Sequence, residues 1–287
     1  MSKSTIDVAQ SIWQWVLSSV ILSDSNTALI NKWICGEKQP TFNQIEKFSK
    51  DTRVPLGYFF LKTPPIDALN LLEFRTVDST TAQNPSRDLI DTVRHMENIQ
   101  EWMREYLVSS GADKVAFVGA VNPNNSTVSV AGEVRKVLGL SINWFEKSKT
   151  LDESFKTLRE AISNIGVVIM MNGIVGNNTR RNLNVDEFRA FALIDEFAPL
   201  IFINSTDSKG GKIFSVLHEF IHIGAAQNSL YNPRQFDLPI VNPLETFCNS
   251  VTAEIITPIE MFNEKWKLST SNASAKINTL SNFFKCS

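Results

Sequence analysis

Two histidines and a glutamate lie close together in the segment His218-Glu219-Phe220-Ile221-His222. On a helix, residues four apart lie on the same face one turn apart, so both imidazoles can bind one ion. Glu219 would then be placed to take a proton from a water molecule that the ion activates. This H-E-x-x-H spacing predicts a catalytic zinc site, and it uses two of the three histidines in the chain.

The residues around the motif favour a metal site over a chance match on an ordinary amphipathic helix. Residues 213–217 and 220–223 are apolar at almost every position, so the helix is expected to be buried. Two histidines and a glutamate in a buried helix need compensating partners, because burying an unpaired polar group is costly. A zinc ion would supply that partner.

Catalytic zinc usually has three protein ligands and a water molecule. The motif supplies two of these protein ligands, so the third must come from another part of the chain. His95 is the remaining histidine, but it lies in the charged stretch 89–106, which favours a solvent-facing side chain. The metzincin pattern needs glycine and histidine where this chain has Ala225 and Asn228, so that class is excluded. A glutamate on a later helix is the remaining common solution.

Glu245 is the favoured third ligand. It follows His222 by 23 residues (245 − 222 = 23) and begins a run with a helical apolar stripe. Asn249, one turn further on, is predicted to orient a ligating histidine. Glu254 is the competing ligand, and an ordinary surface position at the start of a helix is the other alternative for Glu245.

The chain resembles the ImmA/IrrE metallopeptidase domain over several segments, and its N-terminal part is similar to the helix-turn-helix-like module often fused to such peptidases. The peptidase segments are 187–191 (EFRAF), 198–204 (APLIFIN), 213–224 (IFSVLHEFIHIG) and 245–258 (ETFCNSVTAEIITP). The N-terminal segments are 33–41 (WICGEKQPT), 44–48 (QIEKF) and 55–61 (PLGYFFL).

The resemblance implies a cytoplasmic zinc metallo-endopeptidase that cleaves a partner protein such as a transcriptional repressor. Its setting would be a mobile element, a toxin–antitoxin pair or a stress response, with a repressor-like substrate or a cognate toxin or antitoxin as partner. The alternative is a non-hydrolytic helix-turn-helix regulator or antitoxin in which the zinc is structural or vestigial. A third hypothesis is a toxin whose proteolytic activity is inhibited by a partner.

Composition agrees with a soluble intracellular protein. The chain has 287 residues, of which 43% are hydrophobic and 20% charged, and its net charge is −2. It has no uncharged apolar stretch of membrane-spanning length and does not begin with a signal peptide, so no membrane association is expected. Three widely spaced cysteines form no disulfide framework and suit a reducing compartment.

The patterns predict an α+β fold in which a helical, helix-turn-helix-like module is followed by a zincin-like catalytic domain with a small sheet and the H-E-x-x-H helix. The module spans residues 1–65, a linker 66–86 and the peptidase domain 87–287, with its core at about 160–262. Expected helices in the module are 9–22, 26–35, 42–51 and 55–61. Those of the peptidase domain are 89–107, 130–138, 151–164 and 274–284, and its strands are 166–172, 188–193 and 200–204.

Three further expectations concern contacts with partners. Strand 200–204 is expected at a sheet edge, where an extended substrate could pair with it. Residues 177–182 are predicted to form a polar loop that could contact substrate. Residues 1–62 carry seven Lys/Arg and five acidic residues, a net charge of +2, so DNA binding by the module is expected to be weak. Residues 284–287 resemble the point at which longer relatives continue into further helices.

Overall fold

The computed structural model describes residues 5–286 except 21, 65–84, 232–242 and 269–271. These residues form two compact units. The first contains the N-terminal helices together with the start of helix α4 as far as Asp91, and the second contains the chain from Thr92 onward. Each unit has its own hydrophobic core.

The N-terminal unit contains three helices and a short 3-10 helix packed around aromatic side chains. Its elements are α1 (Gln10–Ser19), α2 (Asp24–Ile34), α3 (Phe42–Thr52) and the 3-10 helix Leu56–Phe60. Trp13 lies at the centre of this core, with its ring 5.2 Å from that of Trp33 and 5.5 Å from that of Phe59. All four elements lie within a few residues of the bounds that the sequence predicts.

Local signals in the sequence set the ends of these helices. Thr41 is the N-cap of α3, and its N–H donates to the side chain of Gln44 at 2.9 Å. Gly36 adopts a φ of +72° directly after α2, a conformation that glycine reaches without steric cost. The unit is therefore a small helical bundle.

The second unit is built on a four-stranded mixed sheet in the order β1-β5-β4-β6. Strand β5 pairs in parallel with β1 and antiparallel with β4, and β4 pairs antiparallel with β6. A separate hairpin joins β2 and β3. The strands are β1 (Val168–Asn172), β2 (Ile174–Val175), β3 (Asn178–Asn182), β4 (Ala190–Leu193), β5 (Leu200–Asn204) and β6 (Ser229–Tyr231).

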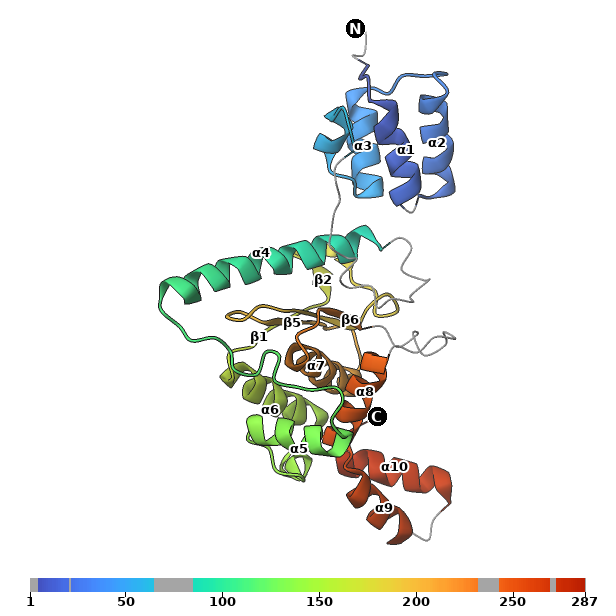
Figure 1. Ribbon diagram of the computed structural model, residues 1–287. Coiled ribbons are helices and arrows are strands. Elements are labelled where there is room, and N and C mark those ends of the chain that lie inside the picture. Colours follow the sequence, from blue (N-terminus) through green and yellow to red (C-terminus); the bar gives the residue numbers. More distant parts are fainter. Residues whose placement is uncertain (1–4, 21, 65–84, 232–242, 269–271, 287) are drawn as a thin grey trace. The chain divides into compact units, whose positions relative to one another are not determined.

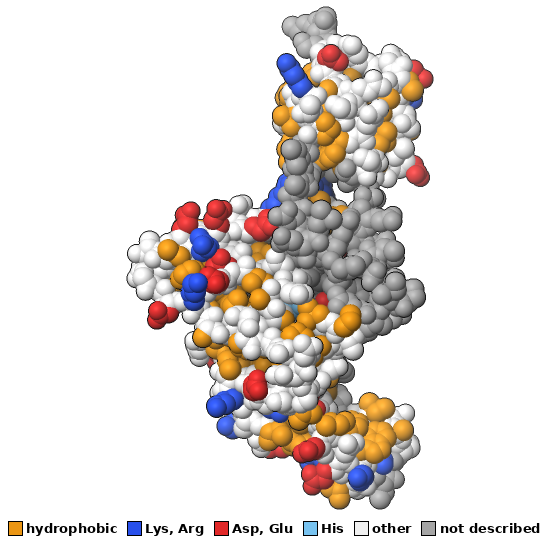
Figure 2. All heavy atoms as spheres, viewed as in Figure 1, with side chains coloured by type: hydrophobic (Ala, Val, Ile, Leu, Met, Phe, Trp, Pro, Cys, Tyr) orange, Lys and Arg blue, Asp and Glu red, His pale blue; other side chains and the backbone are white. Residues whose placement is uncertain are grey.

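Helices cover both faces of this sheet, as Figure 1 shows, with α4 on one face and α6 and α7 on the other. On the α4 side, Gln100 donates to the backbone carbonyls of Leu193 and Ala198 at 2.9 and 3.0 Å. The exposed surface of α4 carries both signs of charge, interspersed (Figure 2). The helices of this unit are α4 (Arg87–Ser109), α5 (Thr127–Val137), α6 (Leu151–Asn164), α7 (Lys209–Gly224), α8 (Pro243–Ile256), α9 (Ile259–Leu268) and α10 (Ala273–Phe284).

Two sequence-based predictions about the strands are wrong. Strand β5 has the predicted bounds but is internal, because β1 and β4 occupy both of its edges, so no substrate can pair with it. Residues 177–182 are not a loop, because most of them form β3. The sequence patterns did not predict the β2–β3 hairpin or strand β6. The α+β class itself is confirmed.

The helices of the described residues differ from membrane-spanning helices in length or hydropathy. Helix α4 has 23 residues, but charged residues recur along it. Within the described part of the chain, no helix combines the length and hydropathy that crossing a membrane requires.

Candidate metal centre

Helix α7 begins at a capped and closely packed turn. Ser208 is the N-cap, and its hydroxyl accepts a hydrogen bond from the Gly211 N–H at 3.0 Å. Asp207 precedes it and forms an ion pair of 3.0 Å with Arg189, which directly precedes β4. A Cβ at Gly211 would come within 2.6 Å of the Asp207 carboxylate group, so any other residue here would displace the Asp207 side chain. These contacts fix where α7 starts relative to the sheet.

The other end of α7 is held against the segment that follows α4. Val121 donates its N–H to the carbonyl of Gly224 at 2.8 Å. The rings of Phe117 and Phe220 stack with their centroids 4.1 Å apart. A Cβ at Gly224 would come within 2.5 Å of the Val121 side chain, so this approach also requires glycine. Helix α7 is thus fixed at both ends, and the motif lies between them.

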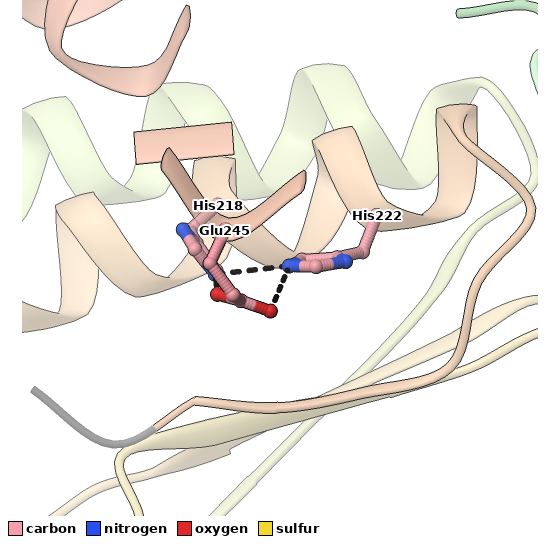
Figure 3. Close-up of side chains that lie close together, drawn as sticks. All are labelled: His218, His222 and Glu245. Carbon is pink, nitrogen blue, oxygen red and sulfur yellow. Dashed lines mark hydrogen bonds and ion pairs between the residues drawn. The ribbon is translucent and has the colours of Figure 1, made fainter. Parts of the chain in front are cut away.

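The structure brings together three of the residues that the sequence predicts as ligands (Figure 3). His218 and His222 lie one turn apart on α7, and Glu245 projects toward them from the first turn of α8. The two Nε2 atoms are 3.1 Å apart, and each is 3.2 Å from one oxygen of the Glu245 carboxylate. Both histidines are almost completely buried, and the Glu245 side chain is 13% exposed.

This geometry fits a metal ion. Around tetrahedral zinc with ligand bonds of about 2.0–2.1 Å, neighbouring ligand atoms lie roughly 3.3 Å apart. The three separations of 3.1 to 3.2 Å are close to that spacing. The donor set, two imidazole nitrogens and one carboxylate, is also that of catalytic His₂Glu zinc sites.

Burial and mutual contact shift the pKa values of these groups. Burial raises the pKa of Glu219 to about 7 and lowers that of His218. Burial alone would raise the pKa of Glu245, but hydrogen bonds with both imidazoles hold it below its usual range. Burial alone would lower the pKa of His222, but hydrogen bonds with Cys248 and Glu245 hold it well above its usual value. An ionised carboxylate facing two imidazoles suits a bound cation.

Glu219 lies beside the cluster but belongs to a different set of contacts. It is completely buried, and its Oε2 accepts a hydrogen bond from the hydroxyl of Ser229 on β6. Its Oε1 is also buried, and no described residue forms a hydrogen bond with it. Ser229 therefore holds Oε2 in place, whereas Oε1 is available to a group that the described residues do not supply.

The same turn of α8 that carries Glu245 also contacts both histidines. Cys248 lies close enough to His222, and Asn249 close enough to His218, to raise the pKa of the neighbouring imidazole. Cys248 is three residues after Glu245, so the helical period could have indicated its position, although the sequence suggests only a core residue. The position of Ser229 beside Glu219 could not be predicted in this way, because β6 is too short to recognise from its sequence.

The two competing ligands lie elsewhere. His95 is exposed on α4 and lines a cavity of about 320 Å³ with β1 residues such as Met170, on the face of the sheet that α4 covers. Glu254 accepts a hydrogen bond from the Ile259 N–H at 3.0 Å, at the start of α9. Among the described residues, only His218, His222 and Glu245 converge as a possible metal-binding group.

The sheet, the helix with two histidines one turn apart and the glutamate on the next helix define the class of the second unit as a metallopeptidase domain. Residues 163–287 match the family model of the IrrE N-terminal-like domain, Peptidase_M78, and this match supports a metallopeptidase of the ImmA/IrrE type. The match contains the whole sheet and the metal centre, and the N-terminal unit lies outside it. No curated protein matches the chain.

Proposed function

We propose that the chain is a zinc-dependent endopeptidase that cleaves a partner protein, such as a transcriptional repressor. His218, His222 and Glu245 would hold the zinc ion, and Glu219 would act as the general base. The observation that carries the proposal is the convergence of the three ligand atoms beside a buried carboxylate with one unpartnered oxygen. A purely structural zinc site has no need for that carboxylate.

Each residue has a role that follows from its contacts. When bound, zinc would polarise the scissile carbonyl and acidify water. Glu219 would take the proton at Oε1 while Ser229 keeps Oε2 in place, and would later return the proton to the leaving amine. Cys248 and Asn249 would hold the two imidazole rings in the orientation that presents both Nε2 atoms to the metal.

The N-terminal unit would supply recognition of the partner rather than strong DNA binding. Phe42 and Phe60 are about half exposed, and their ring centroids are 6.4 Å apart. Leu61 is exposed beside Phe60 in the sequence. Exposed apolar side chains that lie together are typical of protein-binding surfaces. A mobile-element, toxin–antitoxin or stress-response setting in the cytoplasm follows from the family resemblance and stays part of the proposal.

The proposal can be tested in cells that express either the wild-type chain or Glu219→Gln. New protein N-termini would be collected and compared by mass spectrometry. A peptidase should produce one or a few N-termini with the wild type that are absent with Glu219→Gln. Glu160→Gln, which changes an exposed glutamate on α6, serves as the matched control and should behave as the wild type.

Identical N-termini in all three samples, together with an unchanged cellular phenotype in Glu219→Gln, would contradict the proposal. That result would favour the non-hydrolytic regulator or antitoxin, in which zinc only stabilises the fold.

A further inference from the structure

Strand β6 occupies one edge of the sheet directly beside the metal centre. Ala190, Phe191 and Ala192 of β4 lie opposite Tyr231, Leu230 and Ser229, in that order. Asn204 of β5 donates to the carbonyl of Arg189 at 2.8 Å, so the backbone groups of residues 189, 191 and 193 face β5. Those of Ala190, Ala192 and Ile194 therefore face β6. The side chain of Asn228 extends this pairing by accepting the Ile194 N–H at 2.6 Å.

The same strand closes the proposed catalytic site. Ser229 is 2% exposed, and its hydroxyl donates to the Glu219 carboxylate, which is itself completely buried. A peptide bond can reach Glu219 only if something moves. Among the described residues outside α7, Ser229 forms the hydrogen bond to this carboxylate, so we expect β6 to be the element that moves.

Strand β6 is also held less firmly than the rest of the sheet. It has three residues, whereas β5 has five and is paired along both edges. The turn that leads into β6 contains Ala226 at a φ of +55°, a conformation that is unfavourable for residues other than glycine. Helix α7 and strand β4, in contrast, lie in the main hydrophobic core.

We propose that β6 is a self-inhibitory strand that occupies the substrate-binding edge of β4. It separates to admit an extended segment of the substrate, whose backbone then pairs with Ala190, Ala192 and Ile194. The chain's own segment shows that this edge accepts an extended backbone in antiparallel register. The inference rests on the proposed peptidase function, and it implies that the enzyme is closed until β6 is displaced.

Hydrogen exchange in the full chain tests whether β6 separates, independently of any activity. The amides of Ala192 and Ile194 face β6, and those of Phe191 and Leu193 on the same strand face β5. If β6 opens while the sheet stays intact, NMR should show the first pair exchanging at least tenfold faster than the second. Equal protection of both pairs would overturn the inference, because β6 would then be a permanent strand.

A reversible cross-link tests whether the opening matters for hydrolysis. Ala190 and Tyr231 form a hydrogen-bonded cross-strand pair, whose Cα atoms lie about 5.5 Å apart in antiparallel sheets, a separation that suits a disulfide. The double variant Ala190→Cys, Tyr231→Cys should lose hydrolysis of dye-labelled casein when oxidised. It should regain hydrolysis on reduction with a phosphine, whereas the wild type should respond little to either treatment.

Full hydrolysis by the oxidised variant would overturn the inference even if the peptidase proposal holds. If the wild type itself does not cleave casein, the exchange pattern alone decides, and the peptidase proposal is tested separately by the N-termini found in cells. Failure of the one proposal is thereby distinguishable from failure of the other.

Discussion

The Nε2 atoms of His218 and His222 lie 3.1 Å apart inside a buried helix. Two neutral imidazoles that present these nitrogens to each other at this distance repel unless a proton or a metal ion lies between them. The Glu245 carboxylate, 3.2 Å from both atoms, adds a negative charge at the same point. A cation bound among these three atoms would therefore stabilise the arrangement.

The first prediction concerns metal content. The purified chain should carry about one zinc ion, because its three protein ligands suffice for a site of catalytic type. His222→Ala should lose most of the metal in elemental analysis. His95→Ala, which changes the exposed histidine on α4, should keep it. Full zinc occupancy in His222→Ala would show that the ligands have been assigned to the wrong residues.

The second prediction separates the two glutamates of α8. Glu245→Ala should weaken zinc binding strongly, since it removes a ligand atom. Glu254→Ala should leave zinc binding nearly intact and mainly lower the melting temperature, because Glu254 hydrogen-bonds the first turn of α9. Zinc titrations and thermal unfolding of both variants would measure the two effects. The reverse order of zinc affinities would move the ligand to Glu254.

The sequence predicts the metal centre better than it predicts the sheet. The four-residue spacing of the histidines and the helical stripe after Glu245 are local patterns, and they suffice to indicate which side chains face each other. The bounds of β5 follow from a local run of residues, so the sequence predicted them correctly. Its predicted edge position was wrong, because the partners of a strand depend on residues far away in the chain. Its run of apolar residues, Leu200 to Ile203, was a signal for an internal strand.

The third prediction concerns the proximity of Asn249 to His218. Asn249→Ala should weaken zinc affinity by about 10- to 100-fold, the usual effect of removing a residue that orients a ligating histidine. Ser250→Ala, at the exposed neighbouring position of α8, should leave the affinity unchanged. Competition with a chromophoric chelator gives both values. Equal affinities in the two variants would remove the orienting role of Asn249.

The fourth prediction concerns DNA. The full chain should bind a labelled duplex only in the micromolar range or weaker at physiological salt, with a shallow dependence on salt concentration. The N-terminal residues 1–62 carry a net charge of only +2, and in α2 the single base Lys32 is accompanied by Asp24. Lys32→Ala should change binding little. Nanomolar, sequence-specific binding would instead support the regulator.

The most direct test of the central claim, that the chain is a peptidase, compares Glu219→Gln with His218→Ala in one complementation assay. Glutamine keeps the size and hydrogen bonding of the buried side chain but cannot accept a proton from water. Glu219→Gln should therefore retain zinc and the melting temperature of the wild type while abolishing the cellular phenotype. His218→Ala should lose zinc and phenotype together. Survival of the phenotype in Glu219→Gln, with its loss in His218→Ala, would contradict the peptidase and identify a zinc-stabilised regulator.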